Sequence, residues 1–113
     1  MRGIGIDVLD VDRFEAAIEK RPGLVTRLFA DSEVEACSKS SRPARHLAAR
    51  FCAKEAAIKA LSLKGVPVRD IVVEGGFGTQ PRLRLDSVHG ELGEAHLSLT
   101  HDRSMAAAVV VAV

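Results

Sequence analysis

Apolar residues alternate with small or polar ones at the beginning of the chain, and this alternation predicts a β-strand over residues 3–8. Ile4, Ile6 and Val8 share one face of this strand, while the other face carries two glycines and Asp7. The glycines leave no side chains on that face, so another backbone or a ligand can approach it closely. Asp7 is its only charge, and the pattern leaves open whether this carboxylate binds local amides or has a function.

A helical period replaces the period of two after this strand. Asp10 has the position of an N-cap for a helix over residues 11–20, and Phe14 lies on the buried face of that helix. Ser32 and Glu35 have the spacing of a capping box, which predicts the beginning of another short helix. Helices therefore follow the first strand.

The longest predicted element is a helix over residues 42–64. Phe51 and Ile58 lie close together on its helical wheel, and Glu55 and Lys59 border this apolar stripe at i and i+4. A helix that is apolar on most sides is buried on most sides, so these charges need partners, a metal ion or shifted pKa values. The simplest alternative is an ordinary ion pair between the two side chains.

Strand patterns dominate the C-terminal half, over residues 70–74, 81–86, 95–100 and 105–113. The expected fold class is α+β: a β-strand, then helices, then an antiparallel three- to four-stranded sheet packed on the long helix. The last strand is apolar on both faces and therefore needs a cover on both. One layer of helices covers one face, so we expect a neighbouring copy to cover the other in an oligomer.

His101 follows an alternating pattern that places it on the same face as Leu97 and Leu99. A histidine at the end of an apolar row is more often a hydrogen-bonded core residue than a catalytic group. The pattern alone therefore favours a structural role for this side chain.

Composition narrows the possible functions. The 113 residues predict one domain, residues 1–113, and the net charge of +1 favours neither a nucleic acid nor a membrane surface as partner. Cys37 and Cys52 form no metal or disulfide motif, and no signal peptide or membrane-spanning run is evident, so the cytoplasm is the expected location.

Three separated patterns occur in one order: residues 3–7 followed by Arg13-Phe14, then residues 50–60 (RFCAKEAAIKA), then residues 98–102 (SLTHD). Together they resemble the holo-acyl-carrier-protein synthases, the short 4′-phosphopantetheinyl transferases, over nearly the whole length. The resemblance implies Mg²⁺-dependent transfer of the phosphopantetheine arm of coenzyme A to a serine of apo-acyl carrier protein. The reaction it implies releases adenosine 3′,5′-bisphosphate and belongs to fatty acid biosynthesis. It also implies a homotrimer with sites at protomer borders.

The resemblance implies roles for four residues at the reacting centre. Asp7 and Glu55 match the magnesium-binding carboxylates, Lys59 matches a lysine on the reacting phosphate, and His101 matches a histidine near the diphosphate. Two carboxylates and a substrate diphosphate suit Mg²⁺, which prefers oxygen ligands. The general base remains open between Glu55, a metal-bound water and His101.

The remaining predicted contacts bind the two substrates. A basic run fits the several phosphates of one small ligand, coenzyme A, better than a nucleic acid. It comprises Arg45, His46, Arg50 and Lys54, together with Lys59 and His101. The acidic carrier protein is expected to contact Arg13, Phe14 and Arg27.

Two short segments, residues 62–67 and 87–94, depart from the family pattern and bear on the coenzyme A wall and the trimer contacts. They leave two alternatives open: a non-catalytic oligomeric module that binds coenzyme A or a nucleotide, and a purely structural subunit. The natural carrier protein and the tolerance of acylated coenzyme A are not evident from the sequence.

Overall fold

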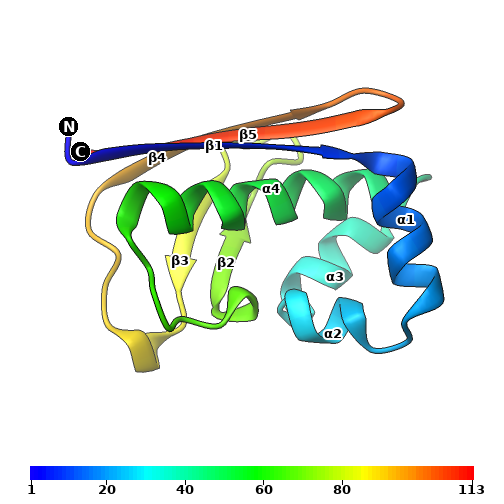
Figure 1. Ribbon diagram of the computed structural model, residues 1–113, viewed down its shortest axis with the longest axis horizontal. Helices are drawn as coiled ribbons and strands as arrows, with labels where there is room; N and C mark the ends of the chain where they lie inside the picture. Colours follow the sequence, from blue (N-terminus) through cyan, green and yellow to red (C-terminus); the bar gives the residue numbers. More distant parts are fainter.

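The computed structural model describes residues 1–113, and Figure 1 shows one long helix between two layers. A strand comes first, four helices follow, and four strands complete the chain. The strands are β1 (Gly3–Asp10), β2 (Ile71–Glu74), β3 (Arg82–Leu85), β4 (Ala95–His101) and β5 (Met105–Ala112). The helices are α1 (Val11–Lys20), α2 (Leu24–Leu28), α3 (Asp31–Ser38) and α4 (Pro43–Leu61), with 3₁₀ turns at Val68–Asp70 and Ser87–His89.

The strands form two antiparallel sheets, a three-stranded one in the order β1-β5-β4 and the pair β2-β3. The three-stranded sheet lies along one side of α4, while β2, β3 and the short helices lie on the other side (Figure 1). The predicted α+β class and the sheet packed on a long helix are confirmed. The β2-β3 hairpin does not extend that sheet, because β2 and β3 pair only with each other.

Alanine explains how α4 is enclosed by both layers. Its buried residues include seven alanines and extend around the helix, with Ala48 and Ala53 completely inaccessible. Small side chains allow other elements to approach the helix closely from several directions. The helix therefore contributes to a core cluster of 19 buried residues without presenting a single apolar stripe.

The glycine face of β1 packs directly on α4. A Cβ atom added to Gly5 would lie 2.0 Å from the carbonyl oxygen of Ala56, and one added to Gly3 would lie 2.1 Å from that of Ala60. The close backbone approach predicted from the sequence is confirmed. It places Asp7, the next residue on this face, beside the helix.

Two local predictions differ from the structure. The capping interaction of α3 uses Glu33, whose Oε1 accepts a hydrogen bond of 2.9 Å from Ala30 N, so the predicted box at Ser32 and Glu35 is wrong. The long helix ends at Leu61, where Ser62 adopts a left-handed conformation (φ 53°), before the predicted end at Lys64. In both cases the sequence pattern allowed the helix to begin or end at either of two positions a few residues apart.

The outer face of the three-stranded sheet carries exposed apolar side chains. Ile4, Ile6 and Val8 are 59%, 67% and 60% exposed, on the face of β1 opposite the glycines. No helix covers this face (Figure 1). No helix of the structure is both long and apolar enough to cross a membrane.

We expect Gly5→Ala to destabilise the protein by about 3 kcal/mol, because the methyl group would collide with the Ala56 carbonyl and separate β1 from α4. Gly65→Ala is the matched control: its added Cβ meets no atom within 4 Å, although the residue has a φ of 80°. Its loss is expected to be limited to backbone strain of about 1 kcal/mol. Urea unfolding of both variants measures the difference, and equal losses would contradict the packing argument.

Candidate active site

Strand β1 and helix α4 bring Asp7 and Lys59 together. Lys59 Nζ donates a hydrogen bond of 2.8 Å to the Ile6 carbonyl and lies 3.4 Å from Asp7 Oδ1. Its ion-pair partner is therefore Asp7 and not Glu55, so the simple i,i+4 pair proposed as an alternative is wrong. The Asp7 side chain is 23% exposed, which leaves it accessible from solvent.

Glu55 belongs to the same group of charges. Burial raises its pKa, the nearby negative charge of Asp7 raises it further, and the positive charge of Lys59 opposes both effects. Two carboxylates repel each other here, and one ammonium only partly offsets this repulsion. An added cation would therefore lower the electrostatic energy of the site. The charges of Asp7 and Glu55 therefore interact, while their role as magnesium ligands, which the family resemblance implies, stays a prediction.

Cys52 lies within this group but has the properties of a packing residue. Burial, the charge of Asp7 and a hydrogen bond to Asp7 raise the pKa of its thiol to about 12. Its side chain is inaccessible, and Sγ lies 3.6 Å from the Ala106 carbonyl oxygen. A thiol protonated at neutral pH is neither a metal ligand nor a nucleophile.

The two carboxylates fit Mg²⁺ when a substrate supplies the remaining ligands. The structure contains no group of three or more His, Cys, Asp or Glu side chains able to hold a metal ion by themselves. Mg²⁺ typically binds one or two carboxylates together with substrate phosphates and water. The oxygens of Asp7 and Glu55 meet that requirement, and a cation bound between them would relieve their mutual repulsion.

A second group of side chains surrounds His101, near the first turns of α4. The rings of His46 and His101 are perpendicular, with their centroids 4.7 Å apart. Burial lowers the pKa of both histidines, and the positive charge of Arg45 lowers both further. Arg45 Nε and His101 Nδ1 are buried and have no hydrogen-bond partner, which contradicts the expectation of a hydrogen-bonded core histidine at position 101.

Arg50 reaches a turn that sequence analysis did not connect with the site. Its Nη2 donates a hydrogen bond of 2.5 Å to the Gly75 carbonyl, and its Cζ lies 4.7 Å from the centroid of the Phe77 ring. Phe77 in turn lies 4.9 Å from the His46 ring. Arg50 is only 2% exposed, so its observed partners are the turn and not solvent.

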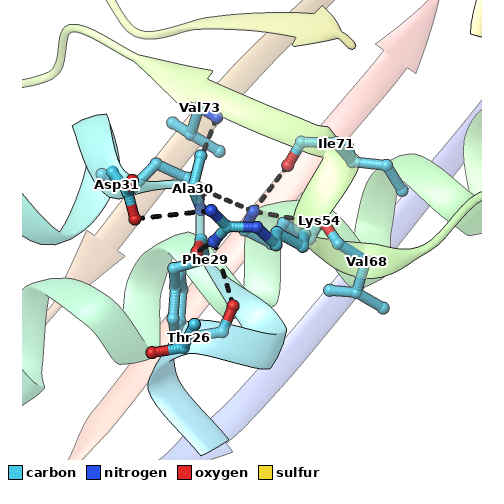
Figure 2. Close-up of polar contacts among 10 residues, drawn as sticks. Thr26, Phe29, Ala30, Asp31, Lys54, Val68, Ile71 and Val73 are labelled. Carbon is cyan, nitrogen blue, oxygen red and sulfur yellow. Dashed lines mark hydrogen bonds and ion pairs between the residues drawn. The ribbon is translucent and has the colours of Figure 1, made fainter. Parts of the chain in front are cut away.

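Lys54 is a correction to the predicted site. Its Nζ binds Glu33 Oε1 at 2.6 Å and the carbonyl oxygens of Ile71 and Val68 at 2.7 and 3.3 Å. Figure 2 shows Lys54 enclosed by these backbone groups. The ammonium is completely buried and has no hydrogen left for a phosphate, so the predicted contact of Lys54 with coenzyme A is wrong.

Comparison with known proteins agrees with this geometry. Residues 3–113 match the family model of the 4′-phosphopantetheinyl transferase superfamily. A holo-[acyl-carrier-protein] synthase of Clavibacter michiganensis is 45% identical, over 98% of this chain and 94% of that protein. The enzyme of the same name from Streptomyces coelicolor is also 45% identical, over 97% of this chain and 95% of that protein. This chain belongs to the 4′-phosphopantetheinyl transferase superfamily.

A solved structure supports the same conclusion. The holo-(acyl-carrier-protein) synthase of Bacillus anthracis, crystallised with CoA (3′,5′-ADP), is 32% identical to this chain and superposes with a TM-score of 0.80. The match covers 96% of this chain and 93% of that one. The predicted resemblance to the holo-acyl-carrier-protein synthases is confirmed, and this transferase has their fold.

The three predicted carrier-protein contacts of the transferase lie in different environments. Arg13 and Arg27 are exposed on α1 and α2. Phe14 is only 7% exposed and packs against the rings of Phe29 and Phe51, with centroids 6.3 and 5.8 Å away. The predicted contact at Phe14 is therefore wrong, because the core already covers this side chain.

Sequence reasoning missed Glu33 and Phe77. Glu33 is 1% exposed and pairs with Lys54, and only its place three residues after Ala30 indicated a capping role. Phe77 is an aromatic residue in a glycine-rich turn, far in sequence from the basic run of α4. Neither pattern indicated the long-range partner.

Lys54→Met tests the corrected role of Lys54. The variant leaves the Glu33 carboxylate buried without its cation, so we expect a loss of about 3–5 kcal/mol in the free energy of unfolding, measured by urea denaturation. The double variant Glu33→Gln/Lys54→Met removes both charges and should recover part of this loss. Unchanged stability combined with weaker coenzyme A binding would restore the phosphate-binding role.

Proposed function

We propose that this transferase moves the 4′-phosphopantetheine moiety of coenzyme A to a serine of apo-acyl carrier protein and releases adenosine 3′,5′-bisphosphate. The main support for this proposal is that Asp7, Glu55 and Lys59 lie together where β1 meets α4. Relatives named for this activity, and one crystallised with coenzyme A, support it.

The residues of this group fit the chemistry. The serine oxygen forms a bond to the phosphorus atom next to the pantetheine, and the bond from that phosphorus to the oxygen bridging the diphosphate breaks. Asp7 and Glu55 would hold Mg²⁺, which when bound supplies positive charge to the diphosphate oxygens. Lys59 would bind the reacting phosphate, because its ammonium lies at the solvent-accessible side of the same group.

The serine must lose a proton, and two groups are candidates to accept it. The raised pKa of Glu55 makes it a better proton acceptor than an ordinary carboxylate. His101 has a lowered pKa and a buried Nδ1 without a partner, so its neutral ring is the rival candidate. Both assignments belong to the proposal.

The basic group around His46 would bind the phosphates of the nucleotide part. Arg45 Nε is a buried donor without an acceptor, and a phosphate oxygen would supply one. Lys39 and His46 line a neighbouring cavity of about 310 Å³, near the lower limit for ligand pockets and thus suited to part of coenzyme A.

A homotrimer with sites at protomer borders belongs to the same proposal. The exposed apolar face of β1 supports it, because exposed side chains such as Ile4 and Ile6 favour burial against another copy. We also propose a cytoplasmic enzyme of fatty acid biosynthesis, in a single domain, on the basis of its relatives' name.

Incubation with apo-acyl carrier protein, coenzyme A and Mg²⁺ should increase the mass of the carrier protein by one phosphopantetheine group. Glu55→Gln and Asp7→Asn should each lower kcat about 100-fold or more without unfolding the protein, because each removes a charge that faces the metal and diphosphate. Intact-protein mass spectrometry measures the reaction, and circular dichroism checks the fold. No mass gain with any metal would indicate a binding module, and full activity in both variants would disprove the metal assignment.

Arg13→Glu should raise KM for the acidic carrier protein about tenfold or more and leave coenzyme A binding unchanged, because Arg13 is exposed on α1. Arg82→Glu is a matched control, since this exposed arginine belongs to β3, which lies away from α1 (Figure 1). Kinetics with each substrate varied in turn measures both effects. Equal losses for the two substrates would refute this division of roles.

A further inference from the structure

The free edge of β2 is occupied by charged side chains instead of another strand. Asp86 N donates to the Asp70 carbonyl, and antiparallel pairing therefore directs the backbone groups of Val72 and Glu74 toward β3. The backbone groups of Ile71, Val73 and Gly75 face the opposite edge. A buried edge of this kind needs hydrogen-bond partners.

Three side chains supply these partners at every second residue. Lys54 Nζ donates to the Ile71 carbonyl at 2.7 Å, Val73 N donates to Glu33 Oε2 at 3.0 Å, and Arg50 Nη2 donates to the Gly75 carbonyl at 2.5 Å. The three side chains are 0%, 1% and 2% exposed, respectively. We call Glu33, Arg50 and Lys54 the edge ladder; Figure 2 shows the part around Lys54 and Val73.

The edge ladder determines where the turn after β2 lies. Gly75 begins this turn, and Arg50 binds its carbonyl and also lies over the Phe77 ring at 4.7 Å. The other neighbour of Phe77 is His46, whose ring lies 4.9 Å away and which in turn contacts His101. A continuous series of contacts therefore leads from the edge ladder to the predicted nucleotide-binding side chains.

We propose that Phe77, held in place by Arg50, is a positioning residue that orients the His46 ring for coenzyme A binding. The inference rests on the proposed function, since it assigns a role within the same site. The ring of Phe77 limits the rotation of His46, and Arg50 limits the movement of Phe77. Arg50 acts through the turn in this account, and not as a ligand of a phosphate.

Two substitutions of Phe77 can distinguish the effect of its aromatic ring on His46 from the effect of side-chain size. Phe77 is 43% exposed, so Phe77→Leu and Phe77→Tyr should both fold. Phe77→Leu removes the ring and should raise KM for coenzyme A about tenfold with kcat within about twofold, whereas Phe77→Tyr keeps the ring and should match the wild type. Glu19→Ala, on an exposed side chain of α1 that belongs to no predicted contact, is the control and should change neither constant.

A double-mutant cycle separates positioning from direct binding. If Phe77 acts through His46, His46→Ala should raise KM for coenzyme A about tenfold, and adding Phe77→Leu should change it no further. A product of the two effects, about 100-fold, would show that each side chain binds the ligand independently and would overturn the proposal. An unchanged KM in Phe77→Leu would also overturn it.

Calorimetry measures the binding of coenzyme A without the carrier protein, so it tests the role of Phe77 even if the proposed transfer reaction does not occur. If the wild type binds coenzyme A but transfers nothing to the carrier protein, the proposed reaction fails, and the same cycle in Kd still tests the coupling of Phe77 to His46. Arg50→Met should weaken binding about as much as Phe77→Leu and should add little in the Phe77→Leu background. If Arg50→Met does not fold, the cycle of Phe77 and His46 decides the question.

Discussion

The contact between the backbone of β1 and that of α4 is the constraint on which the site depends. Gly3 and Gly5 lie against the carbonyl groups of Ala60 and Ala56, where any larger side chain would collide. This contact brings the next residue on that face, Asp7, within the electrostatic influence of Glu55. Two acids that are far apart in sequence therefore meet because small residues at the interface allow the strand and the helix to approach.

Helix α4 presents different charges to its two sides. Glu55 and Lys59 face β1, where their surroundings remain accessible to a substrate and a cation. Arg50 and Lys54, also four residues apart, face the β2-β3 hairpin and are buried. Adjacent residues of a helix differ by about 100° in direction, so neighbouring charges such as Lys54 and Glu55 have unrelated roles. Lys54 Nζ has three hydrogen-bond partners, whereas the Arg50 guanidinium binds the Gly75 carbonyl through Nη2 and leaves its buried Nε unpaired.

The two groups of site residues differ in electrostatic character. The group at Asp7 and Glu55 concentrates negative charge, whereas the group at His46 and His101 lies beside the positive charge of Arg45. His46 and Glu55 are nine positions apart on α4, which corresponds to about 14 Å along the helix axis. A long substrate with several phosphates, assisted by a cation at the acidic end, matches this separation better than a compact ligand.

The sequence by itself determined the elements, the fold class and the glycine face of β1, while Asp7 and Glu55 became candidates for one site only through the family resemblance. These features are local, since periodicity and residue size specify which face of an element is apolar or open to close approach. Only the tertiary structure decided which long-range partner each charge has: Lys59 pairs with Asp7, Lys54 pairs with Glu33, and Phe77 packs on His46. The physical reason is that helical period gives the direction of a side chain, while its partner depends on how elements distant in sequence pack around it. The same reason explains why Phe14 and Lys54, although correctly placed on their helices, were wrongly expected to meet substrates.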